Sequence, residues 1–346
     1  MGSLTIGIDL GDKKHEVCVL DQEGNIVERF SVGNTKKQLR KVFPKYADAL
    51  VAIETGTHSP WISRELEDLG CHVLVGNARK LRMIWGQSHK TDPGDAEMLA
   101  RIARFDKELL YPIHHRSQQA QIDLEVIKAR DLLVSARTDL VNHIRSIVKS
   151  HGERLPSCNA ECFHKKAKAA MPEFLSLVMA PLLEHMASLT ALIKDYDKKI
   201  EHLALNDYPE TKCLLQVKGV GLLTALAFVL IIESADRFKK SRSVGPHIGL
   251  VPRKDQSGQI DKHLRITKEG NKYLRRLLVG CSQYILGPFG PDCDLRRFGE
   301  RKITPGNRVS KRKATVAVAR KLSVLLHSLW STGEVYEPLR NNKKAA

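Results

Sequence analysis

The order of secondary-structure elements in the first 76 residues constrains most strongly what this chain can fold into. Three short strand patterns come first, joined by tight turns such as Glu23-Gly24-Asn25, and helices then alternate with buried strands. The predicted strands lie at residues 4–10, 16–21, 26–32, 49–54 and 72–76, and the predicted helices at 36–46 and 60–69. Three antiparallel strands followed by βαβ units predict an α/β domain with a mixed, RNase-H-like sheet.

The middle of the chain predicts two long helices after a shorter one at 94–104. Residues 117–149 contain no Gly or Pro and repeat apolar side chains at three- and four-residue steps, and residues 173–205 do the same around one tolerated proline, Pro181. Two such helices predict a long antiparallel coiled-coil arm, for which a plain helical bundle is the alternative. A mainly helical C-terminal domain and a disordered tail complete the expected α/β plus α organisation, in four parts at 1–110, 115–206, 207–335 and 336–346.

Charge is distributed unevenly along the chain. The 346 residues have a formal net charge of +17. Residues 1–100 contain 13 Lys and Arg against 14 Asp and Glu, whereas the rest of the chain contains 43 against 25. This asymmetry favours a nearly neutral catalytic domain joined to parts that bind a polyanion, with an ordinary basic surface as the alternative.

Cysteine usage and hydropathy give expectations about location. Seven cysteines without a framework spacing favour free thiols in a reducing compartment, and no signal peptide precedes the first strand. The longest apolar run, residues 222–232, is too short to span a bilayer. We therefore expect a cytoplasmic protein without a membrane partner. Cys158, Cys162 and His164 lack a standard zinc-ligand spacing, so no zinc site is predicted.

Four carboxylates occupy positions that suit catalysis. Asp9 lies on the first strand, Glu54 ends the buried strand, and Asp92 and Asp95 begin a helix in "KTDPGDA", where Asp92 is expected to be the N-cap. If the two strands are neighbours, their ends and this helix start can converge. Converging carboxylates require a cation, for which Mg²⁺ is expected and Mn²⁺ is the alternative, and two such ions can clamp a phosphodiester. Taken singly, Asp9 could be a turn residue and Asp92 only a helix cap.

A glycine-rich turn in the C-terminal part predicts phosphate contact. The segment "LLQVKGVGLLTALAFVLII" has the form of a helix–hairpin–helix, in which Gly219 and Gly221 permit a tight turn at a helix start and Lys218 adds charge. A turn that only packs two helices together is the alternative.

A second candidate centre surrounds Ser257-Gly258, which lies between two short strands and among many cations. Such cations could activate a serine nucleophile and stabilise a pentacovalent phosphate, although Ser-Gly is also common in plain hairpin turns. Residues 296–321 add ten Lys and Arg against the single acid Glu300. The residues of these segments expected to contact nucleic acid are Arg253, Lys254, Arg265, Lys268, Asn271, Arg275, Arg276, Lys311 and Arg312.

The segments "GIDLGDKKHEVCV", "AIETGTH" and "KTDPGDA" resemble the DEDD-motif insertion-sequence transposases and the related Piv DNA invertases. "GLVPRKDQSGQIDKHLRITKEGNKYLRR" is similar to the pattern that these proteins carry in their C-terminal transposase domain. The resemblance implies an RNase-H-like fold similar to the RuvC resolvase, with Asp9, Glu54, Asp92 and Asp95 as metal ligands. It also implies that Ser257 is the nucleophile and forms a phosphoserine link to DNA.

These observations predict a transposase or site-specific recombinase that exchanges strands between donor and target double-stranded DNA. The resemblance also implies a structured guide RNA (a bridge RNA) that pairs with both DNA partners. Because the serine lies some 160 residues from the acids, a homodimer or homotetramer is expected. Two rival functions remain at this stage: a RuvC-like structure-specific endonuclease that hydrolyses DNA with water, and a nucleic-acid-binding scaffold without catalysis.

Overall fold

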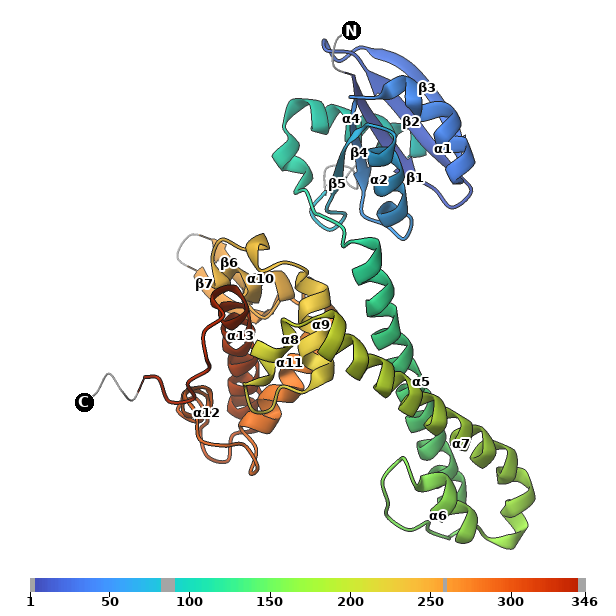
Figure 1. Cartoon of the computed structure of the whole chain (residues 1–346), viewed down its shortest axis with the longest axis vertical. Coiled ribbons are helices and arrows are strands. Elements are labelled where there is room, and N and C mark those ends of the chain that lie inside the picture. Colours follow the sequence, from blue (N-terminus) through green and yellow to red (C-terminus); the bar gives the residue numbers. More distant parts are fainter. Residues whose placement is uncertain (1–3, 82–90, 258–259, 342–346) are drawn as a thin grey trace. The chain divides into compact units, whose positions relative to one another are not determined.

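The computed structural model of the protein describes residues 4–81, 91–257 and 260–341. The chain divides into two compact units, residues 1–116 and 117–346 (Figure 1). The arm and the C-terminal helices share the second unit, and the finer four-part division stays a prediction. Each unit is described by itself.

The first unit is built on a five-stranded mixed sheet of order β3-β2-β1-β4-β5. The strands β1 and β2 pair antiparallel, as do β2 and β3, whereas β1 and β4, and β4 and β5, pair parallel. This confirms the predicted mixed α/β architecture and is compatible with an RNase-H-like fold. The strands are β1 (Thr5–Leu10), β2 (Lys14–Leu20), β3 (Ile26–Gly33), β4 (Leu50–Glu54) and β5 (His72–Gly76).

Helices cover both faces of this sheet. On one face, Ile6 and Ile8 of β1 pack with Leu39, Ile62 and Leu66 from the first two helices. On the other face, Ala52 of β4 packs with apolar side chains of the helix that contains the Asp92/Asp95 pair. The helical elements are α1 (Lys36–Val42), η1 (Phe43–Tyr46), α2 (Ser59–Asp68), α4 (Asp92–Phe105) and η2 (Lys107–Leu110).

The prediction that Asp92 caps its helix is wrong. Thr91 is the N-cap: its backbone is extended (φ −139°) and its hydroxyl accepts a hydrogen bond from the Gly94 N–H at 3.3 Å. A threonine oxygen here satisfies one of the open donors of the first turn. Asp92 is the first helical residue, where its negative charge complements the helix dipole and its carboxylate need not serve as the cap.

The second unit begins with a pair of long helices. Their antiparallel direction follows from contacts in reverse order, because Arg130 bonds Asp197 and Arg137 bonds Thr190. Their far ends and α6 bury a small apolar cluster around Ile144. The coiled-coil character of this arm stays a prediction. Its elements are α5 (Gln118–Ser150), α6 (Phe163–Ala169), α7 (Glu173–His202) and the π-helical turn η3 (Leu203–Asp207).

The segment Glu173–Asp207 is long and apolar enough to cross a bilayer, with a mean hydropathy of 1.5 over its most apolar window. A third of that window is buried inside the protein. One such helix is weak evidence for a membrane span, because a core helix passes the same test on length and composition.

The C-terminal part of the second unit surrounds α9, which is apolar on every side and buried from Thr224 to its end, as a central helix must be. The start of α5 packs into the same core through Ala120, Leu124 and Ile127. The helices of this part are α8 (Thr211–Leu215), α9 (Leu222–Ile232), α10 (Val244–Ile248), α11 (Lys272–Ile285), α12 (Asp294–Glu300) and α13 (Arg308–Thr332). Two 3₁₀ turns, η4 (Ala235–Arg237) and η5 (Ser241–Ser243), precede α10, and the hairpin β6 (Pro252–Ser257) and β7 (Ile260–Ile266) follows it.

Candidate active site and nucleic-acid interface

Asp9 and Glu54 lie where two neighbouring parallel strands end, Asp9 as the last residue but one of β1 and Glu54 as the last residue of β4. The register pairs Ile8 of β1 with Ile53 of β4, so the two acids are the next residues along their strands. Side chains alternate between the faces of a strand. Ile8 packs with α1 and α2, and Ala52 packs with α4, so both carboxylates belong to the face that α4 covers.

The helix α4 crosses that face in direct backbone contact with β1. A Cβ added to Gly7 would lie 2.0 Å from the carbonyl oxygen of Ala96, so only glycine permits this approach. The direction of α4 follows from its end, where Arg104 donates a hydrogen bond of 2.9 Å to the carbonyl of Gln22, at the edge where β1 begins. The N-terminus of α4 therefore lies at the opposite edge, where β1 and β4 end.

Asp92 and Asp95 lie at this helix start. Asp95 is buried, with 6% of its surface exposed, and belongs to the helix face that packs on the sheet. Asp92 is exposed. Its charge acts on Lys14 at the start of β2. The pKa of Lys14 is raised mainly by a hydrogen bond to Glu16 and to a smaller extent by the charge of Asp92. The four predicted acids thus share one face and one edge of the sheet. In the described part of the chain, no three or more His, Cys, Asp or Glu side chains form a group that could hold a metal ion.

Glu16 is a fifth carboxylate at this edge, which the sequence analysis did not select. It pairs directly with Asp9 across the antiparallel strands, so the two side chains lie on the same face. Lys14 donates to its carboxylate at 2.7 Å and the Ser31 hydroxyl donates at 2.7 and 2.8 Å. These hydrogen bonds lower the pKa of Glu16. The alternation in "KHEVCVL" was the available signal, because it places Glu16 and Cys18 on one face.

Ser257 is the last residue of β6, and its backbone pairs with Ile260 at the tip of the hairpin. Its side chain, and the whole of Gly258, lie outside the described residues. The base of the hairpin is fixed by two glycines in the left-handed region, Gly249 and Gly270. A Cβ on Gly249 would lie 2.2 Å from the Glu269 carbonyl, and one on Gly270 would lie 2.0 Å from the His247 carbonyl. The glycines of "GLVP" and "KEGN" therefore permit two chain segments to touch below the serine hairpin.

The predicted nucleic-acid contacts fall into exposed cations and residues that the fold already uses. Arg253, Lys254, Arg265 and Lys268 are exposed along the hairpin and just after it. Lys311 and Arg312 are exposed at the start of α13.

The three predicted contacts around α11 have structural partners. Asn271 is the N-cap of α11 and accepts the Leu274 N–H at 2.9 Å. Arg275 donates to the carbonyls of Ile248 and Glu269, at 2.7 and 2.9 Å. Arg276 forms an ion pair with Asp131 of α5. Contact of these three residues with nucleic acid stays a prediction, and it would compete with bonds that hold the unit together.

The turn between α8 and α9 contains Lys218, Gly219 and Gly221. Gly219 has φ +96°, and a Cβ there would lie 2.7 Å from the Tyr284 ring of α11. Gly221 is the N-cap of α9 and has open space beside its Cα, and Lys218 is exposed. One glycine thus serves helix packing, and the other leaves the start of α9 accessible.

Two family models match this chain. One, for DEDD-type transposases of IS110 elements and described as a transposase, matches residues 6–152, which include all four predicted acids. The other, described as the transposase IS116/IS110/IS902 family, matches residues 211–290, which include Ser257.

Named transposases are similar to this chain over most of its length. A probable family 20 transposase of Pseudomonas aeruginosa is 26% identical and covers 96% of this chain and 98% of its own. The transposase for insertion sequence element IS1328 of Yersinia enterocolitica is 27% identical over 81% of this chain and 83% of its own. The transposase for IS1111A of Coxiella burnetii is 23% identical over 96% of this chain and 90% of its own.

An acidic edge on a mixed sheet, a basic C-terminal unit and family models that match both of them lead to one conclusion. The chain belongs to the IS110/IS116/IS902 family of transposases and is a DNA transposase.

Proposed function

We propose that this transposase cleaves and rejoins DNA strands through a phosphoserine link to Ser257, aided by a divalent cation that Asp9, Glu54, Asp92 and Asp95 hold. The observation that carries the proposal is that these acids, far apart in the sequence, reach one face and one edge of the sheet. A shared edge is what a phosphodiester site needs, because its ligands must act on one phosphate.

The donor chemistry of this edge suits a hard cation. All four predicted ligands are carboxylates, and Mg²⁺ and Mn²⁺ prefer oxygen. Carboxylates that converge on one point repel one another, and a bound cation would offset that repulsion. When bound, such an ion supplies charge stabilisation to the phosphoryl group undergoing substitution. The chain itself contributes rigidity, because Asp95 is buried and α4 is locked onto β1 at Gly7.

Ser257 would act as the nucleophile. Its hydroxyl oxygen forms a bond to the scissile phosphorus, the bond from phosphorus to one strand's oxygen breaks, and that oxygen accepts the proton that the serine loses. One phosphodiester is exchanged for another, so the bond energy is kept for rejoining. The exposed cations Arg253, Lys254 and Arg265 on the hairpin would stabilise the extra charge on the phosphate.

The partners of this reaction are donor and target double-stranded DNA. The acids and the serine belong to different units of the chain, so we propose that a homodimer or homotetramer completes each site, with the long-helix arm as a coiled-coil element. We further propose that a structured guide RNA selects the DNA. We also propose that the α8–α9 turn contacts phosphates as a helix–hairpin–helix. The basic charge of the second unit supports the binding of RNA and the contact with phosphates.

Adduct trapping tests the serine. The full chain, with the RNA transcribed beside its gene and labelled DNA carrying the element's ends, is denatured after reaction in Mg²⁺, and the DNA bound to protein is measured. Ser257→Ala should abolish both adduct and cleavage, whereas Ser157→Ala, an exposed serine elsewhere in the chain, should behave as wild type. Cleavage that persists in Ser257→Ala would show that water is the nucleophile, as in a structure-specific endonuclease.

A further inference from the structure

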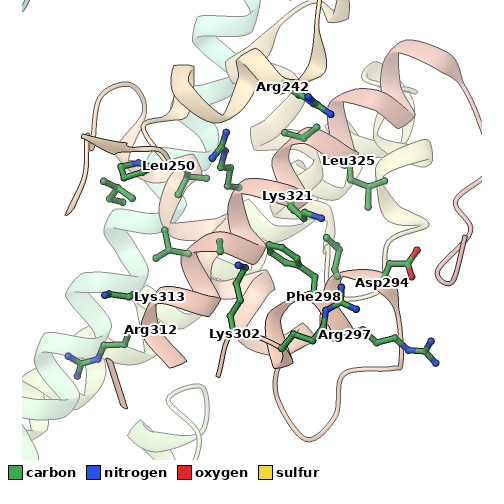
Figure 2. Close-up of a pocket in the computed structure, with 18 of the residues that line it drawn as sticks. Arg242, Leu250, Asp294, Arg297, Phe298, Lys302, Arg312, Lys313, Lys321 and Leu325 are labelled. Carbon is green, nitrogen blue, oxygen red and sulfur yellow. The ribbon is translucent and has the colours of Figure 1, made fainter. Parts of the chain in front are cut away.

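A cleft of about 1690 Å³ runs along α13 in the C-terminal part (Figure 2). Its floor follows α13 from Val309 to Ser328, about 28 Å at the rise of an α-helix. The hairpin contributes one wall through Leu264, and α12 with the segment after α13 contributes the other walls. Pockets for small molecules measure roughly 300–1,000 Å³, so this cleft has room for a larger, extended ligand.

The lining is strongly cationic, with 11 Lys and Arg against two acids, Asp294 and Glu337. Two of the cations, Arg297 and Arg340, have ion-pair partners outside the lining. Several others have no carboxylate within ion-pair distance among the residues that the structure describes: Lys302, Arg312, Lys313, Arg320 and Lys321. The cleft therefore offers a row of uncompensated positive charge.

Apolar surface lies between these charges. Val309 at the start of α13 and Leu264 of β7 are 58% and 45% exposed, although both line the cleft. Phe298 of α12 lies at the centre beside two lysines, with the Lys321 ammonium 4.0 Å and the Lys302 ammonium 4.9 Å from the ring centroid (Figure 2). These cation–π contacts hold the two lysine ammonium groups at the middle of the cleft, so positive charge is present there as well as along the edge.

We propose that this cleft binds a single nucleic-acid strand, with phosphates against the lysines and arginines and with unpaired bases over the apolar floor. A positive groove with apolar or aromatic surface is the usual design for single strands, since their bases have free faces. The bases of a duplex are stacked on one another, so they cannot contact the apolar floor and this contact adds nothing to the affinity. Aromatic residues are only 5% of this chain, so charge supplies most of the affinity and the floor supplies the preference for unpaired bases.

The proposal rests on the proposed function, in which strands separate and an RNA has unpaired loops. Binding is measured by fluorescence anisotropy with the full chain and four probes of equal length: single-stranded DNA, single-stranded RNA, duplex DNA, and a DNA strand without bases. Both base-containing single strands should bind, and their relative affinities show which of them the cleft prefers. The strand without bases should bind about tenfold more weakly if one or two bases contact the floor.

Variants locate this binding in the cleft. Lys302→Gln with Lys313→Gln should weaken single-strand binding about tenfold and lower the salt slope by about 0.7 for each lost phosphate contact. The control, Lys165→Gln with Lys166→Gln on α6, removes the same charge from exposed positions outside the cleft. Val309→Ser, an exposed floor position, should reduce the difference between strands with and without bases.

Two results would overturn the proposal: equal binding of the strands with and without bases, or equal losses in the cleft and α6 variants. Neither depends on strand cleavage, because the assay requires no metal, no serine and no element ends. A failed adduct experiment with intact cleft binding would reject the serine mechanism alone, and the reverse result would reject the cleft alone.

Discussion

The Cα of Gly7 lies so close to Ala96 of α4 that an added Cβ would be 2.0 Å from the Ala96 carbonyl oxygen and 2.5 Å from the Ala100 nitrogen. Both atoms belong to the helix backbone, so no side-chain rotation can relieve the clash. Gly7→Ala should therefore push α4 away from β1 and destabilise the first unit by about 1–3 kcal/mol. Thermal unfolding measures this loss.

The same displacement would move Asp92 and Asp95 away from Asp9, so DNA cleavage should fall even at temperatures where Gly7→Ala is folded. Gly56→Ala is the control for stability, because a Cβ there meets no atom within 4 Å. Equal melting temperatures for the two variants would contradict the close packing of α4 on β1.

Glu16→Gln should slow cleavage without unfolding the protein. The variant removes a carboxylate directly across from Asp9 and frees Lys14 to pair with Asp92. Both changes make the edge less negative, so a higher Mg²⁺ concentration should be needed for half-maximal rate. Titration of the cleavage rate with Mg²⁺ measures the shift. The exposed Glu23, in the β2–β3 turn, provides a matched control as Glu23→Gln.

Tyr208→Phe should destabilise the second unit. The Tyr208 hydroxyl donates a 2.6 Å hydrogen bond to Asp123 of α5, a buried acid that also accepts from the Gln119 side chain. Loss of a bond to a buried charge costs about 1–3 kcal/mol. Urea unfolding compares this variant with Tyr284→Phe, at a half-exposed ring whose hydroxyl has no such hydrogen bond among the described residues. Similar urea midpoints for the two variants would show that the Tyr208 hydrogen bond to Asp123 does not stabilise the folded protein.

The stability of the first unit should fall as the pH is lowered, and protonation of the Glu65 carboxylate should be one cause. The carboxylate of this buried acid of α2 accepts a 2.5 Å hydrogen bond from Arg40 and lies 3.5 Å from the Lys36 ammonium. The Arg40 hydrogen bond is the main cause that lowers the pKa of Glu65, and Lys36 lowers it further. A lowered folded pKa gives stability that is present above the unfolded value, about 4.3, and is lost as pH falls through the folded value.

Glu65→Gln should therefore lower stability at neutral pH and flatten its decline below about pH 4.3. Melting temperatures across pH measure both effects. Glu67→Gln, at an exposed position of the same helix, should keep the wild-type decline. A parallel decline for wild type and Glu65→Gln would exclude this residue as the source.

Much of the first unit could be predicted because its signals are local. Short apolar strand patterns predict β1 to β5, and the turn at Gly24 sets the hairpin of β2 and β3. The capping residue of α4 was mistaken because Thr91 and Asp92 are both good N-caps, and only the backbone angle of Thr91 decides between them. Glu16 was missed because its importance comes from pairing across strands, which depends on register.

The C-terminal site was harder to predict, because cations look alike in a sequence. Arg275 and Arg276 read as nucleic-acid contacts until their partners Ile248, Glu269 and Asp131 are known. The cleft along α13 combines residues from β7, α12 and α13, and only tertiary packing brings these elements side by side. The cluster of basic residues at 296–321 was visible, but its apolar neighbours on β7 were not.

Carboxylates at one edge of the sheet are proposed to act together on a phosphodiester, and the rate of DNA strand cleavage in Mg²⁺ is the sharpest test of this role. Asp9→Asn is compared with Asp12→Asn, whose side chain is 92% exposed and three residues away. We expect a loss of about a thousandfold for Asp9→Asn, equivalent to several kcal/mol of transition-state stabilisation, and little change for Asp12→Asn. A folded Asp9→Asn protein that cleaves at the wild-type rate would contradict it.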